Sequence, residues 1–345
     1  MLKYILLFYS TVVFCQNTTV LYELKKKCND ISIGAVVDKK YYKGYTTLVE
    51  NKGEYPLQGK LNLKVNSNFP LPYSFICGNS DQSFKPSALF TVSKEKLRFK
   101  LDSIEMFMPV LPLKDKSSVL LDDQYKFNAS FSKLLNIFYN KEEDNLKLES
   151  LLVEYSKENC DSYMLFWTLV QHFQFRGFRE AYFQSFKNLS PKIRNSEYGK
   201  MFYNDLINSL SLSEKSKFPD LQFQNKAILS SLGKSYTLVE FWFSHCKPCL
   251  EEIPVYKKIY SKYKNKGFEM FSISTDRSQD IKKWKEVIRE EKMDWSQLLD
   301  ENGIESKKYS INTFPTTFIL DSNGYIIKKN VSSKELEKFL EKNLK

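Results

Sequence analysis

Histidine is scarce in this chain, which has only two, His172 and His245, far apart in the sequence. The chain also contains a single Cys-x-x-Cys pair, formed by Cys246 and Cys249. A structural zinc site usually needs four cysteine or histidine ligands, which requires a second pair at a suitable spacing. The composition therefore argues against zinc, and we expect neither a bound metal nor a cofactor.

Long apolar runs are missing after residue 15, so no later segment is expected to span a membrane. Residues 5–14 are apolar and follow Lys3, a pattern that is typical of a signal peptide. We therefore expect residues 1–15 to be removed before Gln16. Export of this kind predicts that the protein resides in the periplasm or cell envelope.

Cys15 offers an alternative at this boundary, because an exported protein can carry a lipid anchor on such a cysteine. Phe14 fits poorly with the small residue that should precede a lipid-modified cysteine. Cleavage is thus the preferred interpretation, and lipidation of Cys15 the less favoured one.

A basic arm is missing too, although the formal net charge is +11. The excess of lysine and arginine is spread along the chain, and runs such as Lys25-Lys26-Lys27 are typical of a solvated surface. We therefore expect no nucleic-acid partner.

Cys28, Cys77 and Cys160 are left after the Cys-x-x-Cys pair is set aside. An oxidising compartment would permit a disulfide between Cys28 and Cys77, which share the N-terminal part of the chain. Isolated buried thiols are the preferred interpretation, and the disulfide stays open as an alternative.

Residues 16–127 have the pattern of a β-rich domain, in which apolar and polar residues alternate. The alternating apolar positions are Leu61, Leu63 and Val65, and further along Leu97, Phe99 and Leu101. An antiparallel sandwich or partial barrel fits this pattern. We find no paired carboxylates, metal cluster or phosphate loop in this region.

Residues 128–216 have the periodicity of helices. Asn128 is expected to cap the first helix, Asp161 or Ser162 a later one, and Ser190-Pro191 to begin the last. Aromatic stripes at helical spacing are typical of a core, and a groove for a client polypeptide is the alternative. Residues 213–218, polar and rich in lysine, are the expected linker.

Residues 217–345 alternate between strand and helix patterns in the order β-α-β-α-β-β-α, which predicts a mixed sheet sandwiched by helices. The apolar run from Tyr236 to Phe243 is long enough for the central buried strand. A helix with apolar residues at helical spacing follows from Cys246 onward. The two cysteines therefore fall on the first turn of that helix.

The position of this pair predicts redox chemistry. A helix N-terminus favours negative charge, so the pKa of the Cys246 thiol should fall, and Lys247 adds to the effect. The thiolate is the attacking species in thiol–disulfide exchange. We expect Cys246 to be the exposed nucleophile and Cys249 to resolve the mixed disulfide, although an inert structural disulfide remains an alternative.

The pattern Phe-Trp-x-x-x-Cys-x-Pro-Cys-x-x-Glu-x-Pro, from Phe241 to Pro254, resembles the TlpA-like thiol–disulfide oxidoreductases of the thioredoxin superfamily. Residues 313–317, Thr-Phe-Pro-Thr-Thr, resemble the loop of that family whose proline is cis and packs against the cysteine pair. The resemblance covers residues 217–345 and implies a thioredoxin-like fold, preceded here by a β-rich domain of unknown function. Its one departure is His245, where the family usually has Trp.

The resemblance implies roles for three further residues. Glu240 matches a buried acid that handles the proton of the resolving cysteine, and burial should raise its pKa; alternatively its carboxylate reaches the surface. Glu252 matches a Glu that tunes thiol acidity and target choice, with an ordinary solvated Glu as the alternative. A cis Pro315 would leave the preceding backbone free to pair with a client.

The sequence thus predicts an exported thiol–disulfide oxidoreductase that acts on client proteins with disulfides or thiols. An electron donor in the membrane or envelope would serve it, in envelope redox homeostasis or in cytochrome c maturation. A peroxiredoxin is a weaker alternative, because that family has Pro and Thr or Ser where this chain has Val239 and Phe243. A non-catalytic envelope binding protein on a thioredoxin-like scaffold is the third.

Overall fold

The computed structural model describes residues 16–26, 28–34, 41, 47–50, 56–65, 69–78, 84–93, 96–114, 118–135, 142–223 and 226–344. The expected signal peptide and Cys15 lie outside these residues. The chain forms two compact units, and each is described by itself. The N-terminal unit comprises Met1–Gln171 and Gln184–Tyr198, and the C-terminal unit comprises His172–Phe183 and Gly199–Lys345.

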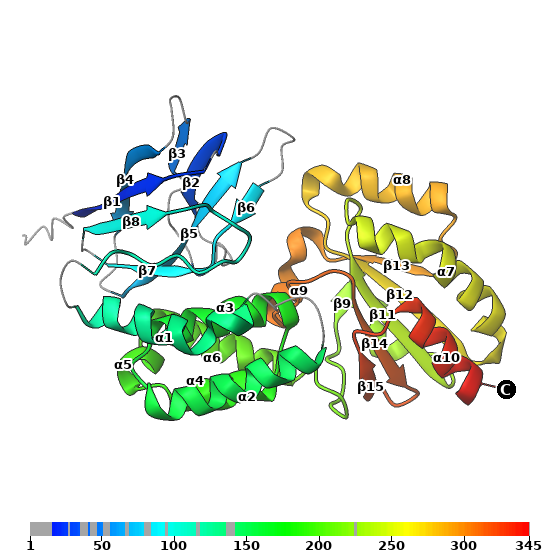
Figure 1. Ribbon diagram of the computed structural model, residues 1–345. Helices are drawn as coiled ribbons and strands as arrows, with labels where there is room; N and C mark the ends of the chain where they lie inside the picture. The colour runs from blue at the N-terminus through cyan, green and yellow to red at the C-terminus, as the bar shows by residue number, and fades with distance from the viewer. Residues whose placement is uncertain are drawn as a thin grey trace, which may run out of the picture. The chain divides into compact units, whose positions relative to one another are not determined.

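Two sheets build the β-rich part of the N-terminal unit, as predicted (Figure 1). The first has the order β4 (Leu57–Val65), β1 (Gln16–Leu24) and β8 (Leu97–Leu101). The second has the order β3 (Thr47–Glu50), β2 (Asp30–Gly34), β5 (Leu71–Gly78) and β6 (Phe84–Pro86), with β7 (Phe90–Val92) also paired to β5.

Aromatic side chains from the two sheets pack against one another edge to face, as in a sandwich, but the expectation of a wholly antiparallel one was wrong, because β1 and β8 pair in parallel. The ring of Phe75 on β5 lies 5.0 Å from Phe99 on β8 and 6.2 Å from Tyr22 on β1, between centroids. Every second side chain of β8 is buried, so the alternation seen in the sequence identified the inward face correctly.

The structure joins Cys28 to Cys77 in a disulfide, so the preferred expectation of isolated thiols was wrong. Strand β2 pairs with β5 in a register that sets Ile31 opposite Cys77, and Cys28 lies three residues before Ile31. Strand pairing over this sequence distance cannot be read from composition. Cys160 is a free, exposed thiol.

The middle region is helical, as predicted, and consists of α1 (Val119–Leu135), α2 (Glu142–Glu158), α3 (Tyr163–Arg176), α4 (Glu180–Asn188), α5 (Pro191–Arg194) and α6 (Glu197–Leu210). The prediction of an Asn128 cap was wrong, because α1 begins nine residues earlier, where Ser118 Oγ accepts a bond from Leu121 N (3.1 Å). Ser162 caps α3 through a bond from Leu165 N (3.0 Å).

Ser190-Pro191 begins the short α5 and not the last helix of this region, which is the separate α6. The aromatic stripes form core: Trp167 of α3 is fully buried, and its indole N–H donates to the Pro70 carbonyl (2.7 Å). Burial of this kind favours the core interpretation over a client groove.

A five-stranded mixed sheet dominates the C-terminal unit and confirms the predicted thioredoxin-like architecture (Figure 1). Its order is β13 (Ser296–Leu299), β12 (Phe268–Ser274), β11 (Tyr236–Trp242), β14 (Thr316–Asp321) and β15 (Ile326–Lys329). The central β11 is parallel to β12 and antiparallel to β14.

Helices cover one face of this sheet, namely α7 (Lys247–Tyr263), α8 (Ile281–Glu291) and α10 (Ser333–Asn343). The other face carries the hairpin of β9 (Gln222–Phe223) and β10 (Lys226–Ala227), with Leu212 and Phe218. Leu238 and Trp242 of β11 belong to the first cluster, whereas Val239 and Phe241 belong to the second.

The expected linker is hydrogen bonded to the sheet. Lys215 N donates to Ile326 O (2.7 Å), and Phe218 N donates to Gly324 O (2.8 Å). Helix α6 also joins this unit, because Ser310 Oγ donates to the buried Asp205 (3.0 Å). The division of the chain at residues 127/128 and 216/217 stays a prediction.

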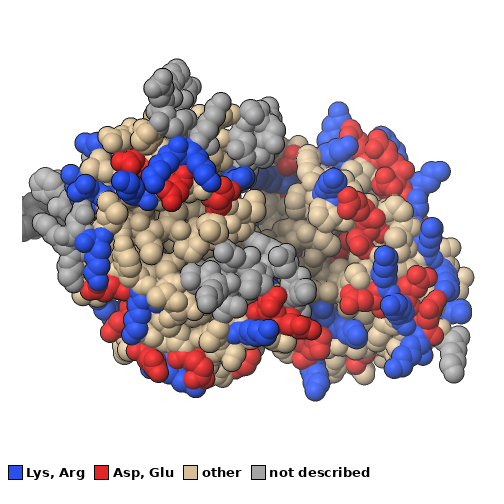
Figure 2. All heavy atoms as spheres, viewed as in Figure 1, with Lys and Arg blue, Asp and Glu red and all other residues tan. Residues whose placement is uncertain are grey.

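In the described part of the chain, no helix is both long enough and apolar enough to cross a membrane. On the face that Figure 2 shows, basic and acidic side chains are interleaved, with no continuous basic tract. Lys262 Nζ lies 3.0 Å from Glu341 Oε1, and Lys264 Nζ lies 3.1 Å from Asp294 Oδ2. Such mixed charge is consistent with a solvated surface.

Candidate active site

The turn from β11 into α7 brings the two cysteines together. Cys246 is the N-cap of α7 and forms a disulfide with Cys249. Its Sγ accepts a bond from Cys249 N (3.3 Å), and its own N–H donates to Phe243 O (3.0 Å). The predicted dithiol thus lies at a helix N-terminus, where backbone N–H groups and the helix dipole favour a thiolate.

Both cysteines are largely buried in the disulfide form, so the expectation of an exposed Cys246 was wrong for this state. Cys246 retains 4% of its accessible surface and Cys249 retains none. The bond between them draws Cys246 into the apolar cluster beneath α7. Cys246 is thus the only member of the pair that keeps any exposed surface in this state.

Asp276 fixes the turn that precedes Cys246, a role that the sequence reasoning missed. Its buried carboxylate accepts bonds from Ser244 N (2.9 Å), Ser244 Oγ (2.7 Å) and Ser274 Oγ (2.6 Å). The sequence signal that could have identified Asp276 is its position two residues beyond β12. The carboxyl ends of neighbouring parallel strands, here β11 and β12, meet at one edge of a sheet.

Glu240 lies in the middle of β11, on the face covered by α7, and only 1% of its surface is exposed. The alternative in which its carboxylate reaches the surface is therefore wrong. Burial raises the pKa of Glu240 to about 8, because the charged form loses its hydration. The hydroxyl of Ser272, which donates to Oε2 (2.7 Å), lowers this pKa, and the charge of Glu252 raises it further.

Glu252 lies one turn beyond Cys249 and is half-buried. Its Oε2 accepts a bond from Ser333 N (3.0 Å), the first residue of α10, so it is not an ordinary solvated carboxylate. Burial raises the pKa of the neighbouring Tyr256, and the charges of Glu240 and Glu252 raise it further. The charge of Glu252 therefore acts on both Glu240 and Tyr256.

The Phe314–Pro315 peptide bond is cis, as the resemblance implied. The ring of Phe314 meets that of Phe243 edge to face, with centroids 5.4 Å apart. Phe243 lies three residues before Cys246, so the loop of Pro315 packs against the active-site turn. His245 is exposed, and its Nδ1 lies 3.4 Å from Ser244 Oγ.

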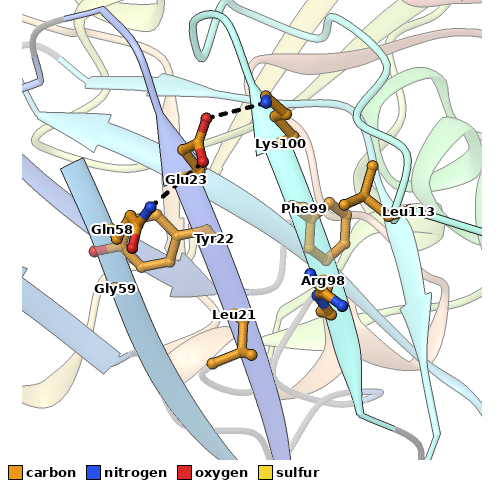
Figure 3. Close-up of a pocket in the computed structure, with 9 residues that line it drawn as sticks. All are labelled: Leu21, Tyr22, Glu23, Gln58, Gly59, Arg98, Phe99, Lys100 and Leu113. Atoms are coloured by element: carbon orange, nitrogen blue, oxygen red, sulfur yellow. Dashed lines mark hydrogen bonds and ion pairs between the residues drawn. The ribbon is translucent and has the colours of Figure 1, made fainter. Parts of the chain in front are cut away.

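Within the described ranges, no group of three or more His, Cys, Asp or Glu side chains is arranged to hold a metal ion. A hollow of about 320 Å³ lies on the N-terminal unit across β1, β4 and β8 (Figure 3). Three of its polar side chains contact one another, since Glu23 accepts from Gln58 Nε2 (3.5 Å) and pairs with Lys100 (3.4 Å). No cysteine lines it, so it offers nothing to redox chemistry.

A Cys-x-x-Cys pair at a helix start, a cis-proline loop beside it and a mixed sheet below define a thioredoxin-like redox module. Residues 214–329 match the AhpC/TSA family. The thiol–disulfide oxidoreductase ResA of Bacillus thuringiensis subsp. konkukian (strain 97-27) is 28% identical over 163 residues, which cover 46% of this chain and 86% of that protein.

Two further similarities are to proteins that are also described as thiol–disulfide oxidoreductases. The sporulation thiol–disulfide oxidoreductase A of Bacillus subtilis (strain 168) is 28% identical over 106 residues, covering 30% of this chain and 64% of that protein. Among solved structures, the thioredoxin domain of a thiol–disulfide oxidoreductase from Bacteroides vulgatus is 31% identical, covers 39% of this chain and 100% of that one, and has a TM-score of 0.36.

The C-terminal part of the chain is therefore a thioredoxin-like module of the AhpC/TSA family, similar to the ResA and TlpA thiol–disulfide oxidoreductases. The family match itself begins at residue 214, after the β-rich sheets and helices α1–α6.

Proposed function

We propose that this protein is an exported thiol–disulfide oxidoreductase that exchanges electrons with client proteins through Cys246 and Cys249. The observation that carries the proposal is the disulfide at the N-terminus of α7, on the sheet face that also holds the buried acid Glu240. A helix N-terminus stabilises the thiolate, and a nearby buried acid can exchange a proton with the inner sulfur.

When the protein reduces a client, the Cys246 thiolate attacks one sulfur of the client disulfide. A bond between Cys246 and that sulfur forms, the client disulfide breaks, and the other client sulfur leaves as a thiolate that takes a proton from water. Cys249 then loses its proton and attacks Cys246 Sγ, which releases the second client sulfur. Two electrons pass from the protein to the client, and the reverse sequence oxidises a client dithiol.

Glu240 is suited to handle the proton of Cys249 in both directions. With a pKa of about 8, its carboxyl is mostly protonated at neutral pH and can give a proton to Cys249 as electrons reach the disulfide. The ionised form, which accepts the proton when Cys249 resolves a mixed disulfide, becomes abundant as the pH approaches 8. The peroxidase alternative gains no support, because the two positions that it needs are the apolar Val239 and Phe243.

The expected place of action is the periplasm or cell envelope, with an envelope or membrane thiol–disulfide protein as the electron donor. The motivating observation is the basic residue and short apolar run at residues 3–14. Envelope redox homeostasis and cytochrome c maturation are the two processes that such a module would serve. Expression of the full chain, followed by fractionation and mass spectrometry of its N-terminus, tests export; a protein that keeps Met1 in the cytoplasmic fraction contradicts it.

The exchange reaction is tested with the full chain carrying Cys249→Ser, which can form the mixed disulfide but cannot resolve it. Incubation with insulin should accumulate a covalent Cys246–insulin adduct that thiol reagents release. Both proteins also carry Cys160→Ser, which removes the exposed free thiol, and the matched control carries Cys246→Ser as well and should form no adduct. Equal adduct in the two proteins would remove Cys246 from the reaction.

A further inference from the structure

A buried hydrogen-bond chain runs from Trp295 through Ser272 to Glu240. Trp295 Nε1 donates to Ser272 Oγ (2.8 Å), and Ser272 Oγ donates to Glu240 Oε2 (2.7 Å). The three residues are exposed by 4%, 0% and 1% respectively, so water cannot easily replace either bond. The three come from neighbouring parts of one sheet: Glu240 pairs with Ser272 across β11 and β12, and Trp295 directly precedes β13.

The chemistry of the indole and hydroxyl groups fixes which of them donates in each of these two hydrogen bonds. An indole N–H can only donate, whereas a serine hydroxyl has one proton and can also accept. Because Trp295 occupies Ser272 Oγ as an acceptor, the hydroxyl proton is left to point at Glu240. A donor fixed in this way stabilises the ionised carboxylate more than the neutral acid.

The other neighbours of Glu240 offer no equivalent donor among the described contacts. Thr317, its partner on β14, donates its hydroxyl to Val331 O (2.9 Å). The ionisable groups that face Glu240 are Glu252 and Tyr256 of α7, and the charge of Glu252 opposes ionisation. Ser272 is therefore the group that offsets part of the cost of burying this carboxylate.

We propose that Trp295 is a positioning residue for thiol–disulfide exchange: by holding the Ser272 hydroxyl as a donor, it sets the pH at which Glu240 gives or takes the proton of Cys249. The proposal rests on the proposed function of Glu240. Trp295 also belongs to the apolar cluster under α7. Packing in that cluster alone would not require its indole N–H to be hydrogen bonded.

The test uses the full chain and two readouts over pH 6–10, the first on the oxidised protein and the second with dithiothreitol as the reductant. The first is the infrared stretch of the protonated carboxyl, isolated by subtracting the spectrum of the Glu240→Gln variant. The second is the pH profile of insulin reduction. Since a hydrogen bond to a charged group lowers the pKa of a carboxyl by about one to two units, Ser272→Ala should raise both midpoints by about that amount, and Trp295→Phe should raise both by about half a unit to one unit.

Trp284→Phe is the matched control. Trp284 belongs to the same apolar cluster, but its indole nitrogen has no hydrogen-bond partner among the described residues. The control should leave both midpoints where the unmodified chain has them. Circular dichroism and the melting temperature of each variant establish that it is folded, and Trp295→Leu, which also lacks the indole N–H, keeps the test available if Trp295→Phe does not fold.

The outcomes separate the two claims. A carboxyl midpoint of Trp295→Phe that agrees with that of the control would overturn the positioning role of Trp295, whatever Ser272→Ala shows and whatever the role of Glu240. A carboxyl midpoint that moves while insulin reduction keeps the same pH profile, including in Glu240→Gln, would overturn the proposed function of Glu240. The proposal is supported if both midpoints move in Trp295→Phe and in Ser272→Ala but not in the Trp284→Phe control.

Discussion

Replacement of Glu240 by Gln should change how the stability of the protein depends on pH. The folded pKa of about 8 lies above the ordinary value of 4.5, because burial disfavours the charged carboxylate. Between these two values the folded chain binds more protons than the unfolded chain. The stability contributed by neutral Glu240 is therefore complete below pH 4.5 and is lost as the pH rises towards 8.

The size of the effect follows from linkage, at 1.36 kcal/mol for each pH unit between the two pKa values. From pH 5 to pH 9, ionisation of Glu240 should cost the folded state roughly 4 kcal/mol. Glu240→Gln removes this cost, because an amide has a similar shape and cannot ionise. The variant should thus gain stability relative to the unmodified chain as the pH rises.

The change in stability with pH is measured by urea unfolding of the oxidised full chain. Tryptophan fluorescence is the probe, since three of the four tryptophans lie in the C-terminal unit. The free energy of unfolding of Glu240→Gln minus that of the unmodified chain should increase by roughly 4 kcal/mol between pH 5 and pH 9. Glu290→Gln, on the exposed side of α8, is the control and should keep the slope of the unmodified chain. The reasoning would be refuted if the free energies of unfolding of Glu240→Gln and of the unmodified chain differed by the same amount at every pH. Glu240 would then not be buried as a neutral acid.

Three further outcomes follow from the same contacts. Asp276→Asn should lower the rate of insulin reduction and destabilise the chain by about 1–3 kcal/mol, because an amide cannot accept all three bonds from Ser244 and Ser274. The control Asp280→Asn should change neither the rate nor the stability. Glu252→Gln keeps an acceptor for Ser333 N but removes a charge, so the infrared midpoint of Glu240 should fall below about 8; a rise would contradict the assigned sign. Glu252→Ala should also cost about 1 kcal/mol in urea unfolding, since Ser333 N loses its partner, and an unchanged stability would show that this bond contributes nothing.

Much of the C-terminal unit could be predicted because its signals are local. The apolar run of β11 is long, and the capping box of Ser332 and Glu335 marks the start of α10 in the sequence itself. Burial of Glu240 follows from its place in the middle of that run. The short β13 and α9 (Ile304–Lys308) were missed, because four or five residues with one buried side chain carry little periodicity.

The missed contacts are those that depend on strand register. Ser272 reaches Glu240 only because β11 and β12 pair in one particular alignment, and Asp276 reaches Ser244 for the same reason. The disulfide of Cys28 and Cys77 likewise depends on the pairing of β2 with β5. Residues far apart in the sequence meet through such pairing, and no local pattern specifies it.

The most direct test of the central claim is the rate at which the full chain catalyses reduction of insulin by dithiothreitol. Cys246→Ser should reduce the catalysed rate to the uncatalysed background, because the attacking thiolate is gone. Cys160→Ser, which removes the exposed free thiol, should leave the rate unchanged. Full activity in Cys246→Ser would contradict the account, since exchange would then proceed without the sulfur at the start of α7.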